Sequence, residues 1–204
     1  MQYNTFSSAA GALALATCLG LSTSAWGQET ETPAEETAPA APGSDLSLGE
    51  DAIGESYTRA VNGAWQMQCL RTENPEQDPC QMYQLIEDSD GTPVAEFSLF
   101  RLPEGGQATA GATIVVPLET QLTAQLTIQV DGNSAKRYPY TFCNQVGCYA
   151  RIGFTNEDVD LFRRGNKAVL SIVPALSPDQ RIRLDVSLAG FTKSFGETSV
   201  IQQQ

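Results

Sequence analysis

Four cysteines are the residues of this chain whose spacing points most clearly to chemistry. Ten residues separate Cys69 from Cys80, and four separate Cys143 from Cys148. Four cysteines can pair in three ways, and these short spacings favour the two local disulfides. Each closure would stabilise the fold by roughly 2–3 kcal/mol through the entropy of the unfolded chain. A metal site built from all four thiolates usually shows C-x-x-C pairs, which this sequence lacks, so we expect no metal and no cofactor.

Histidine is absent from the sequence. This absence excludes Ser-His-Asp and Cys-His nucleophiles and every histidine-ligated metal site. Carboxylates remain as candidate acids and bases, but Asp158 and Asp160 are better explained as charges at the start of a helix. Residues 87–91 (Glu-Asp-Ser-Asp-Gly) contain half of a calcium loop without its remaining ligands, which favours a hairpin turn. We therefore predict no catalytic residue.

Three tyrosines on either side of the second cysteine pair form a candidate binding surface. They are Tyr138, Tyr140 and Tyr149, and tyrosine is common in protein interfaces. Strand alternation puts Tyr138 and Tyr140 on one face together with Phe142, and such a face more often belongs to the core. Both interpretations remain open from the sequence.

The N-terminus has the features of an export signal. Residues 9–21 form an apolar run of signal-peptide length, too short for the roughly 20 residues that cross a bilayer. Residues 25–27 (Ala-Trp-Gly) match a small-x-small cleavage site, so we predict a signal peptide over 1–27, although residues 1–8 contain no Lys or Arg. After its removal no transmembrane helix is expected.

Lipidation of Cys18 is the alternative at this end of the chain. Residues 15–18 (Leu-Ala-Thr-Cys) resemble a lipobox, but threonine is a poor residue directly before the modified cysteine. Cleavage after Gly27 removes Cys18 and leaves an even number of cysteines. That number suits an oxidising compartment, so we expect the periplasm or the cell exterior of a Gram-negative bacterium.

Residues 28–60 are predicted to be an acidic, disordered linker. Pro, Ala, Glu and Thr dominate the segment, and it has few large apolar residues with which to offset its chain entropy. The chain has a net charge of −12, and residues 1–60 hold eight of its 24 acidic residues with a single basic one. No part of the chain has the basic surface that binding to nucleic acid or anionic lipid requires.

Residues 61–200 are predicted to form one all-β domain, followed by a tail at 201–204. A helix is expected between a cap at Thr155 or Asn156 and Gly165, with acidic residues near its start and arginines near its end. About nine short strands with one helix favour a β-sandwich. Strands are expected at 65–70, 80–86, 94–102, 112–116, 122–130, 138–143, 148–154, 168–173 and 181–188, with a last strand segment around 191–195.

Several residues together resemble one family. They are Trp65 with Cys69 and Cys80, Pro117-Leu118, Asp131-Gly132, Cys143 with Gly147-Cys148 and Ala150, Gly165, and Ser187-Leu188-Ala189-Gly190-Phe191. This pattern resembles the invasion-associated locus B family of exported alphaproteobacterial proteins over residues 61–196. The resemblance implies an immunoglobulin-like β-sandwich in the periplasm or at the cell surface, and it supplies no catalytic residue.

These observations favour a non-enzymatic exported protein that binds an envelope or host protein or glycan. A β-sandwich presents loops and strand edges to partners, which suits such a role. Two alternatives belong to other classes. A carboxylate-based hydrolase of envelope polymer needs two acids about 5–9 Å apart. A small-molecule carrier needs an apolar cavity on the order of several hundred cubic ångströms.

Overall fold

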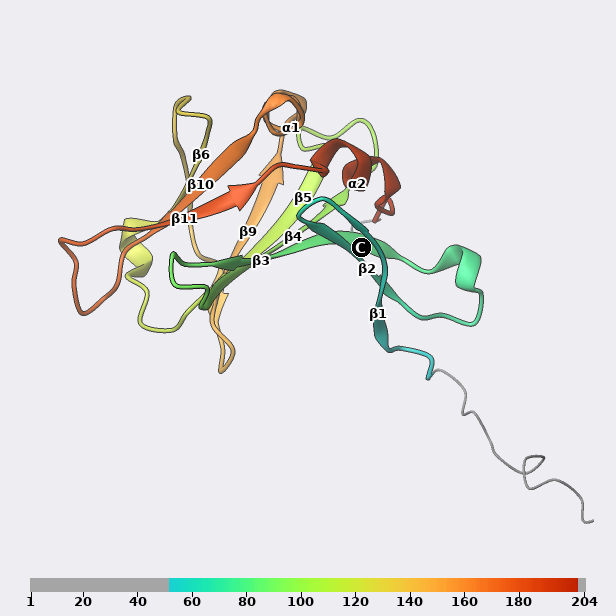
Figure 1. The fold of residues 1–204 in the computed structure, drawn as a ribbon, viewed down its shortest axis with the longest axis horizontal. Helices are drawn as coiled ribbons and strands as arrows, with labels where there is room; N and C mark the ends of the chain where they lie inside the picture. The colour runs from blue at the N-terminus through green and yellow to red at the C-terminus, as the bar shows by residue number, and fades with distance from the viewer. Residues whose placement is uncertain (1–51, 202–204) are drawn as a thin grey trace, which may run out of the picture. The chain divides into compact units, whose positions relative to one another are not determined.

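The computed structural model describes residues 52–201, and these residues form two antiparallel β-sheets (Figure 1). The larger sheet has the strand order β1-β2-β3-β4-β5-β9-β8 and the smaller one β11-β10-β6-β7. The strands of the larger sheet are β1 (Ser56–Asn62), β2 (Trp65–Leu70), β3 (Cys80–Glu87), β4 (Pro93–Arg101), β5 (Ala110–Val116), β8 (Phe142–Cys143) and β9 (Cys148–Phe154). Those of the smaller sheet are β6 (Leu126–Val130), β7 (Lys136–Tyr138), β10 (Lys167–Ile172) and β11 (Ile182–Ser187). The helices are α1 (Asn156–Arg164) and α2 (Phe191–Glu197), with short 3₁₀ turns at Pro75–Gln77 and Leu122–Ala124.

The predicted β-sandwich is confirmed, and residues 52–201 contain eleven strands and two short helices instead of about nine strands and one helix. Alternating burial along β2 and β3 shows why: each strand turns every second residue toward the core. The helix predicted before Gly165 is also confirmed, with Thr155 as its N-cap in a capping box. No helix within residues 52–201 has the length and apolar character needed to cross a membrane. The predicted signal peptide and Cys18 lie outside the described residues.

The domain begins earlier than the sequence predicted. β1 covers Ser56–Asn62 and pairs with β2, so the end of the predicted 28–60 linker belongs to the larger sheet. A β-bulge in the middle of β1 breaks the period-2 pattern, which is why the sequence does not reveal the strand. At the other end, the N–H of Ile201 donates to the carbonyl of Arg101 (2.9 Å), so the predicted 201–204 tail starts within the fold.

Two segments predicted as strands contain helical turns. The segment around 191–195 was expected to be a strand, and this prediction is wrong because the segment belongs to α2. Phe191 and Phe195 are four residues apart, so a helix buries both on one face. The segment predicted at 122–130 starts with the 3₁₀ turn Leu122–Ala124, and only its second half is a strand.

The strand predicted at 138–143 is divided between the two sheets. Tyr138 ends β7 beside β6, whereas Phe142 begins β8 beside β9. Pro139 lies in the crossing and has no N–H with which to continue a ladder. The chain therefore leaves the smaller sheet here and joins the edge of the larger one.

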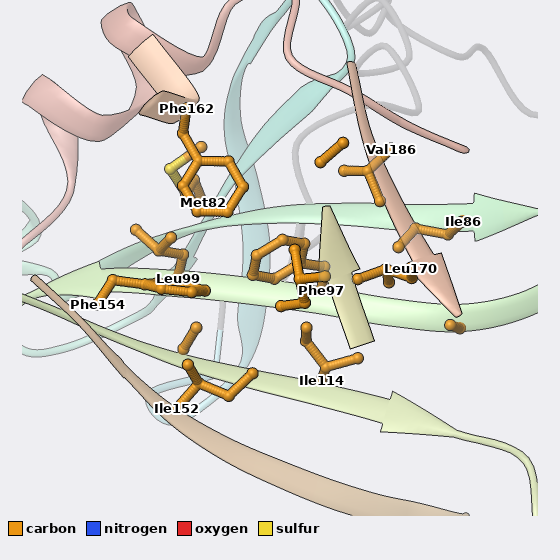
Figure 2. Packing of buried hydrophobic residues seen from close by; sticks show 14 of the residues in the cluster. Met82, Ile86, Phe97, Leu99, Ile114, Ile152, Phe154, Phe162, Leu170 and Val186 are labelled. Atoms are coloured by element: carbon orange, nitrogen blue, oxygen red, sulfur yellow. The ribbon is translucent and has the colours of Figure 1, made fainter. Parts of the chain in front are cut away.

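Aromatic rings fill the centre of the sandwich. Trp65 is fully buried and makes edge contacts with Phe97 and Phe191, at ring-centroid distances of 5.5 and 5.6 Å. Phe162 of α1 contacts Phe154 at 5.1 Å. Figure 2 shows Phe97, Phe154 and Phe162 gathered with aliphatic side chains from both sheets. Trp65 is thus a central residue of the core.

The two predicted disulfides are confirmed. Cys69 lies directly opposite Cys80 on β2 and β3, and Cys143 lies directly opposite Cys148 on β8 and β9. Each bridge therefore joins neighbouring antiparallel strands and closes the loop between them. The second bridge is one of few connections that hold the two-residue strand β8 to the sheet.

Asp78 organises the loop that the first disulfide closes. Its carboxylate accepts hydrogen bonds from the Tyr57 hydroxyl at 2.7 Å and from the backbone N–H and hydroxyl of Thr72, both at 2.8 Å. Arg59 approaches the same carboxylate at 3.5 Å. These donors, with the Tyr57 hydroxyl as the largest cause, lower the pKa of Asp78. The loop is thus fixed by a carboxylate that is ionised at neutral pH.

Gln84 connects the two sheets. This side chain is 6 % exposed and lies between the core residues Met82 and Ile86 on the inner side of β3. Its amide N–H donates to the carbonyl of Ser187 at 2.9 Å, and its amide oxygen accepts from the N–H of Ser187 at 3.0 Å. Ser187 ends the edge strand β11. The glutamine amide therefore supplies the hydrogen bonds that a further strand would otherwise provide.

We expect Gln84→Leu to lower the free energy of unfolding by about 1–3 kcal/mol, because it leaves the Ser187 peptide groups without partners. Urea denaturation followed by circular dichroism measures the loss. Gln81→Leu is the matched control on the outer side of the same strand, and it should change stability by no more than about 0.5 kcal/mol. Equal effects of the two substitutions would contradict the bridging role of Gln84.

Candidate functional site

The three tyrosines predicted as a binding surface do not lie together. Tyr138 packs its ring edge-on against the core residue Phe154 at 5.9 Å, and burial raises its pKa to about 12. Tyr140 also packs against the core, and burial raises its pKa to about 12. Tyr149 stacks instead on Phe142, with ring centroids 4.6 Å apart. Two of the tyrosines thus support the core, and only Tyr149 belongs to an open surface.

The carboxylates singled out in α1 have structural partners. Asp158 forms the capping box with Thr155, and its other oxygen lies 2.5 Å from the ammonium of Lys136. Asp160 is exposed and pairs with Arg163 at 3.3 Å. Each carboxylate therefore has the role in helix stabilisation that its position suggested.

The segment 87–91 is a hairpin turn between β3 and β4. The carboxylate of Asp88 accepts hydrogen bonds from the N–H groups of Asp90 and Thr92, both at 2.9 Å, and Gly91 has a φ of 78°. This carboxylate organises the turn itself. Among residues 52–201, no group of three or more Cys, Asp or Glu side chains is placed to hold a metal ion.

One pocket opens beside the Lys136–Asp158 pair. Its volume is about 30 Å³, and its walls include Ile128, Phe154 and Phe162. This space holds about one water molecule, whereas ligand pockets measure about 300–1,000 Å³. Two depressions of about 450 and 510 Å³ are larger, and they lie at the domain surface around Gly153 and around Gly105.

The outer face of the larger sheet carries a row of apolar side chains. Strand register places Leu85 opposite Glu96, Glu96 opposite Val115, Val115 opposite Tyr149, and Tyr149 opposite Phe142. The residues between them in each strand point to the core, so this row faces away from it. Leu85 and Phe142 keep 41 % and 42 % of their surface exposed.

We call this surface the outer-face patch. Val146, at the tip of the β8–β9 turn, borders it with 70 % of its surface exposed, and a groove of about 240 Å³ runs between Val146 and Leu85. Exposed apolar side chains gathered on one sheet face are a feature of interaction sites. The patch consists of Leu85, Val94, Val115, Phe142, Val146 and Tyr149.

Two opposite charges accompany the outer-face patch. Glu96 lies within the row and Arg151 lies one residue pair further along β9, opposite Thr113. Within residues 52–201 neither charge forms an ion pair. The Arg151 guanidinium lies over the ring of Phe142 at 5.7 Å from its centroid, and the charge of Glu96 adds to burial in raising the pKa of Tyr83. Both charges are therefore available to a partner.

The sequence contained one signal for this surface. In the β-branched run Thr113–Val116, Val115 puts an apolar side chain on the outer side of β5, where a strand with one solvated face usually has a polar residue. This apolar residue was visible in the sequence, but the register that lines it up with Tyr149 and Leu85 comes from strand pairing.

Comparisons with known proteins agree with this fold. The family model described as "Invasion associated locus B (IalB) protein" matches residues 65–199. The crystal structure of invasion associated protein B from Bartonella henselae is similar to this chain, with a TM-score of 0.55 and 22% sequence identity, over 66% of this chain and 91% of that one. No curated protein matches. The family match spans nearly all of the described sandwich, including both disulfides, and this chain belongs to the invasion-associated locus B family.

Proposed function

We propose that this domain is a non-enzymatic binding module that is exported to the bacterial envelope or cell surface and holds its partner through the outer-face patch. The observation that carries the proposal is the exposed apolar row on a sheet face, with its unpaired Glu96 and Arg151. Large exposed side chains such as Leu85 and Phe142 lose unfavourable contact with water when a partner covers them.

The chemistry of the patch supports binding over catalysis. One carboxylate and one guanidinium accompany apolar side chains, and the sequence offers no histidine to act as a base between them. The planar guanidinium of Arg151 carries several N–H donors with which it can orient an anionic group of a partner. Such a surface suits recognition, in which shape and charge match a partner.

Both disulfides support the exported location. Two bridges that close short loops persist in an oxidising compartment and are rare in the cytosol. A partner in the envelope or on a host cell would meet the protein there. Recovery of the native protein from the cytosol with reduced cysteines would contradict this location.

A photocrosslinking residue at position 146 tests the binding role. We expect this probe, at the edge of the outer-face patch, to give one discrete crosslinked product in cells that export the protein. The matched control is position 104, where Glu104 is exposed in the β4–β5 connection, which leads into the end of β5 opposite to the one beside Cys148 and Val146. No product at position 146, or the same products at both positions, would overturn the proposal.

A further inference from the structure

We propose that the partner on the outer-face patch is a second copy of this chain, so that the protein forms a two-fold dimer through the outer faces of its larger sheets. This inference rests on the proposed binding role of the patch and names its occupant. The inference is argued from the positions of Glu96 and Arg151 on the two sides of β5.

The two charges lie on opposite sides of β5. Glu96 is on β4 and Arg151 is on β9, the two strands that pair with β5. Val115 faces Glu96 across one ladder, and Thr113 faces Arg151 across the other. Two strand spacings of about 4.8 Å and one same-face repeat of about 6.8 Å separate the charges, which places them about 12 Å apart. The midpoint between them falls on β5, between Thr113 and Val115.

A two-fold axis through this midpoint makes the surface complementary to itself. When the axis lies in the plane between two facing sheets and crosses the line from Glu96 to Arg151 at right angles at its midpoint, each glutamate faces the arginine of the other copy. Val115 and Tyr149 lie beside the axis on one side of the midpoint, and Thr113 and Ser98 lie beside it on the other. Each of these residues then packs near the same residue of the second copy. Isologous interfaces have this property, because one patch must match itself after rotation.

The absence of other partners for these charges favours this occupant. Within the described residues Glu96 and Arg151 have no ion pair, and an apolar contact that covered only one of them would leave a charge desolvated and unpaired. The two-fold rotation forms two equivalent pairs of Glu96 with Arg151 in a single interface. The ring of Phe142 lies against the guanidinium of Arg151 and already restricts its orientation in the free protein. Arg151 therefore loses less conformational entropy when a partner binds.

The charges of the outer-face patch also matter for the repulsion between two copies of this acidic chain. Each copy has a net charge of −12, so the long-range interaction between two copies is repulsive on average. The two charges of the patch cancel, and most of its remaining side chains are apolar. Contact between two copies at this face therefore brings no excess of like charge together.

Charge reversal gives a direct test. Sedimentation equilibrium of the exported, oxidised protein over a concentration series should show a monomer–dimer equilibrium. Glu96→Arg and Arg151→Glu should each weaken the dimer by at least about tenfold in Kd, because each places like charges opposite one another. The double variant Glu96→Arg with Arg151→Glu should recover most of the affinity, since the pairs are restored in reverse. Glu104→Arg, which makes the same charge change in the exposed β4–β5 loop, should leave Kd within about twofold.

Three results would overturn the dimer: a monomer at every concentration, a dimer that both single reversals leave unchanged, or a double variant as weak as the single ones. Unchanged thermal unfolding of each variant shows that loss of dimer is not loss of fold. If the protein is monomeric while the probe at position 146 still crosslinks to a different envelope protein, the second copy is the wrong occupant and the binding role stands. If both experiments are negative, the binding role fails too.

Discussion

Replacing Gly190 by alanine should lower the free energy of unfolding by about 2–5 kcal/mol, because it combines a steric clash with an unfavourable backbone conformation. A Cβ atom at this position would lie 1.9 Å from the carbonyl oxygen of Asn62. Gly190 also has a φ of 86°, in the left-handed region that side chains disfavour. The clashing oxygen belongs to the backbone of Asn62, so it cannot move aside as the end of a flexible side chain would.

Chemical denaturation of the oxidised protein measures this effect, and Gly196→Ala is its matched control. A Cβ at Gly196 meets nothing within 4 Å, and this residue lies in α2 without a positive φ. Alanine there should be neutral or stabilise the helix by up to about 1 kcal/mol. If the two substitutions had the same effect, the close packing around Gly190 would not matter for stability.

The close packing at Gly190 accounts for the role of the segment Ser187–Phe191, which belongs to the family pattern. Gln84 holds Ser187 against the larger sheet, and the carbonyl of Ala189 accepts a hydrogen bond from the N–H of Ala64 at 3.1 Å. Phe191 then begins α2 and enters the aromatic core. This segment therefore has a structural role, because its contacts hold the smaller sheet and α2 against the larger sheet.

Trp65→Ala should cost about 3–5 kcal/mol, the usual loss when a large buried aromatic side chain is removed from a core. Trp65 has no exposed surface and contacts rings from β4 and α2. Its removal would leave a cavity where the larger sheet, Phe97 and Phe191 meet. Circular dichroism is the suitable signal for denaturation, because the fluorescence of the tryptophan itself is lost with the substitution.

Trp65→Phe separates the ring from its N–H group. The indole N–H is buried without a hydrogen-bond partner among the described residues, so the phenyl ring removes an unsatisfied donor while it keeps part of the packing. The loss should be clearly smaller than for alanine, about 1–2 kcal/mol. An unchanged midpoint for Trp65→Ala would show that this side chain does not support the core.

Several features could be predicted from the sequence because they depend on neighbouring residues. The alternation from Trp65 to Leu70 predicted a strand, and the caps at Thr155 and Gly165 predicted a helix. The disulfides followed from spacing, since Cys143 and Cys148 are too close in the chain to need a distant partner. In each case the physical determinant lies within one turn, one strand or one hairpin.

Other features depended on contacts between distant segments. Phe191 and Phe195 fit a strand or a helix equally well in so short a run, and burial against Trp65 and α1 decided for the helix. Gln84 interrupts an apolar face, and only the approach of β11 gives its amide a partner. The crossing at Pro139 left Tyr138 in the smaller sheet and Tyr149 in the larger one, although the sequence had placed both in one candidate surface.

The cysteine pairs could therefore be predicted from the sequence, whereas the candidate site could not. Their types and spacing determined two local bridges and, with the absent histidine, excluded whole classes of catalysis. Only the tertiary structure decided which side chains share a surface, because the register of four strands brings Leu85, Glu96 and Tyr149 together on the outer face. A strand pattern tells which residues alternate, whereas pairing between strands that are distant in the chain tells which of them become neighbours.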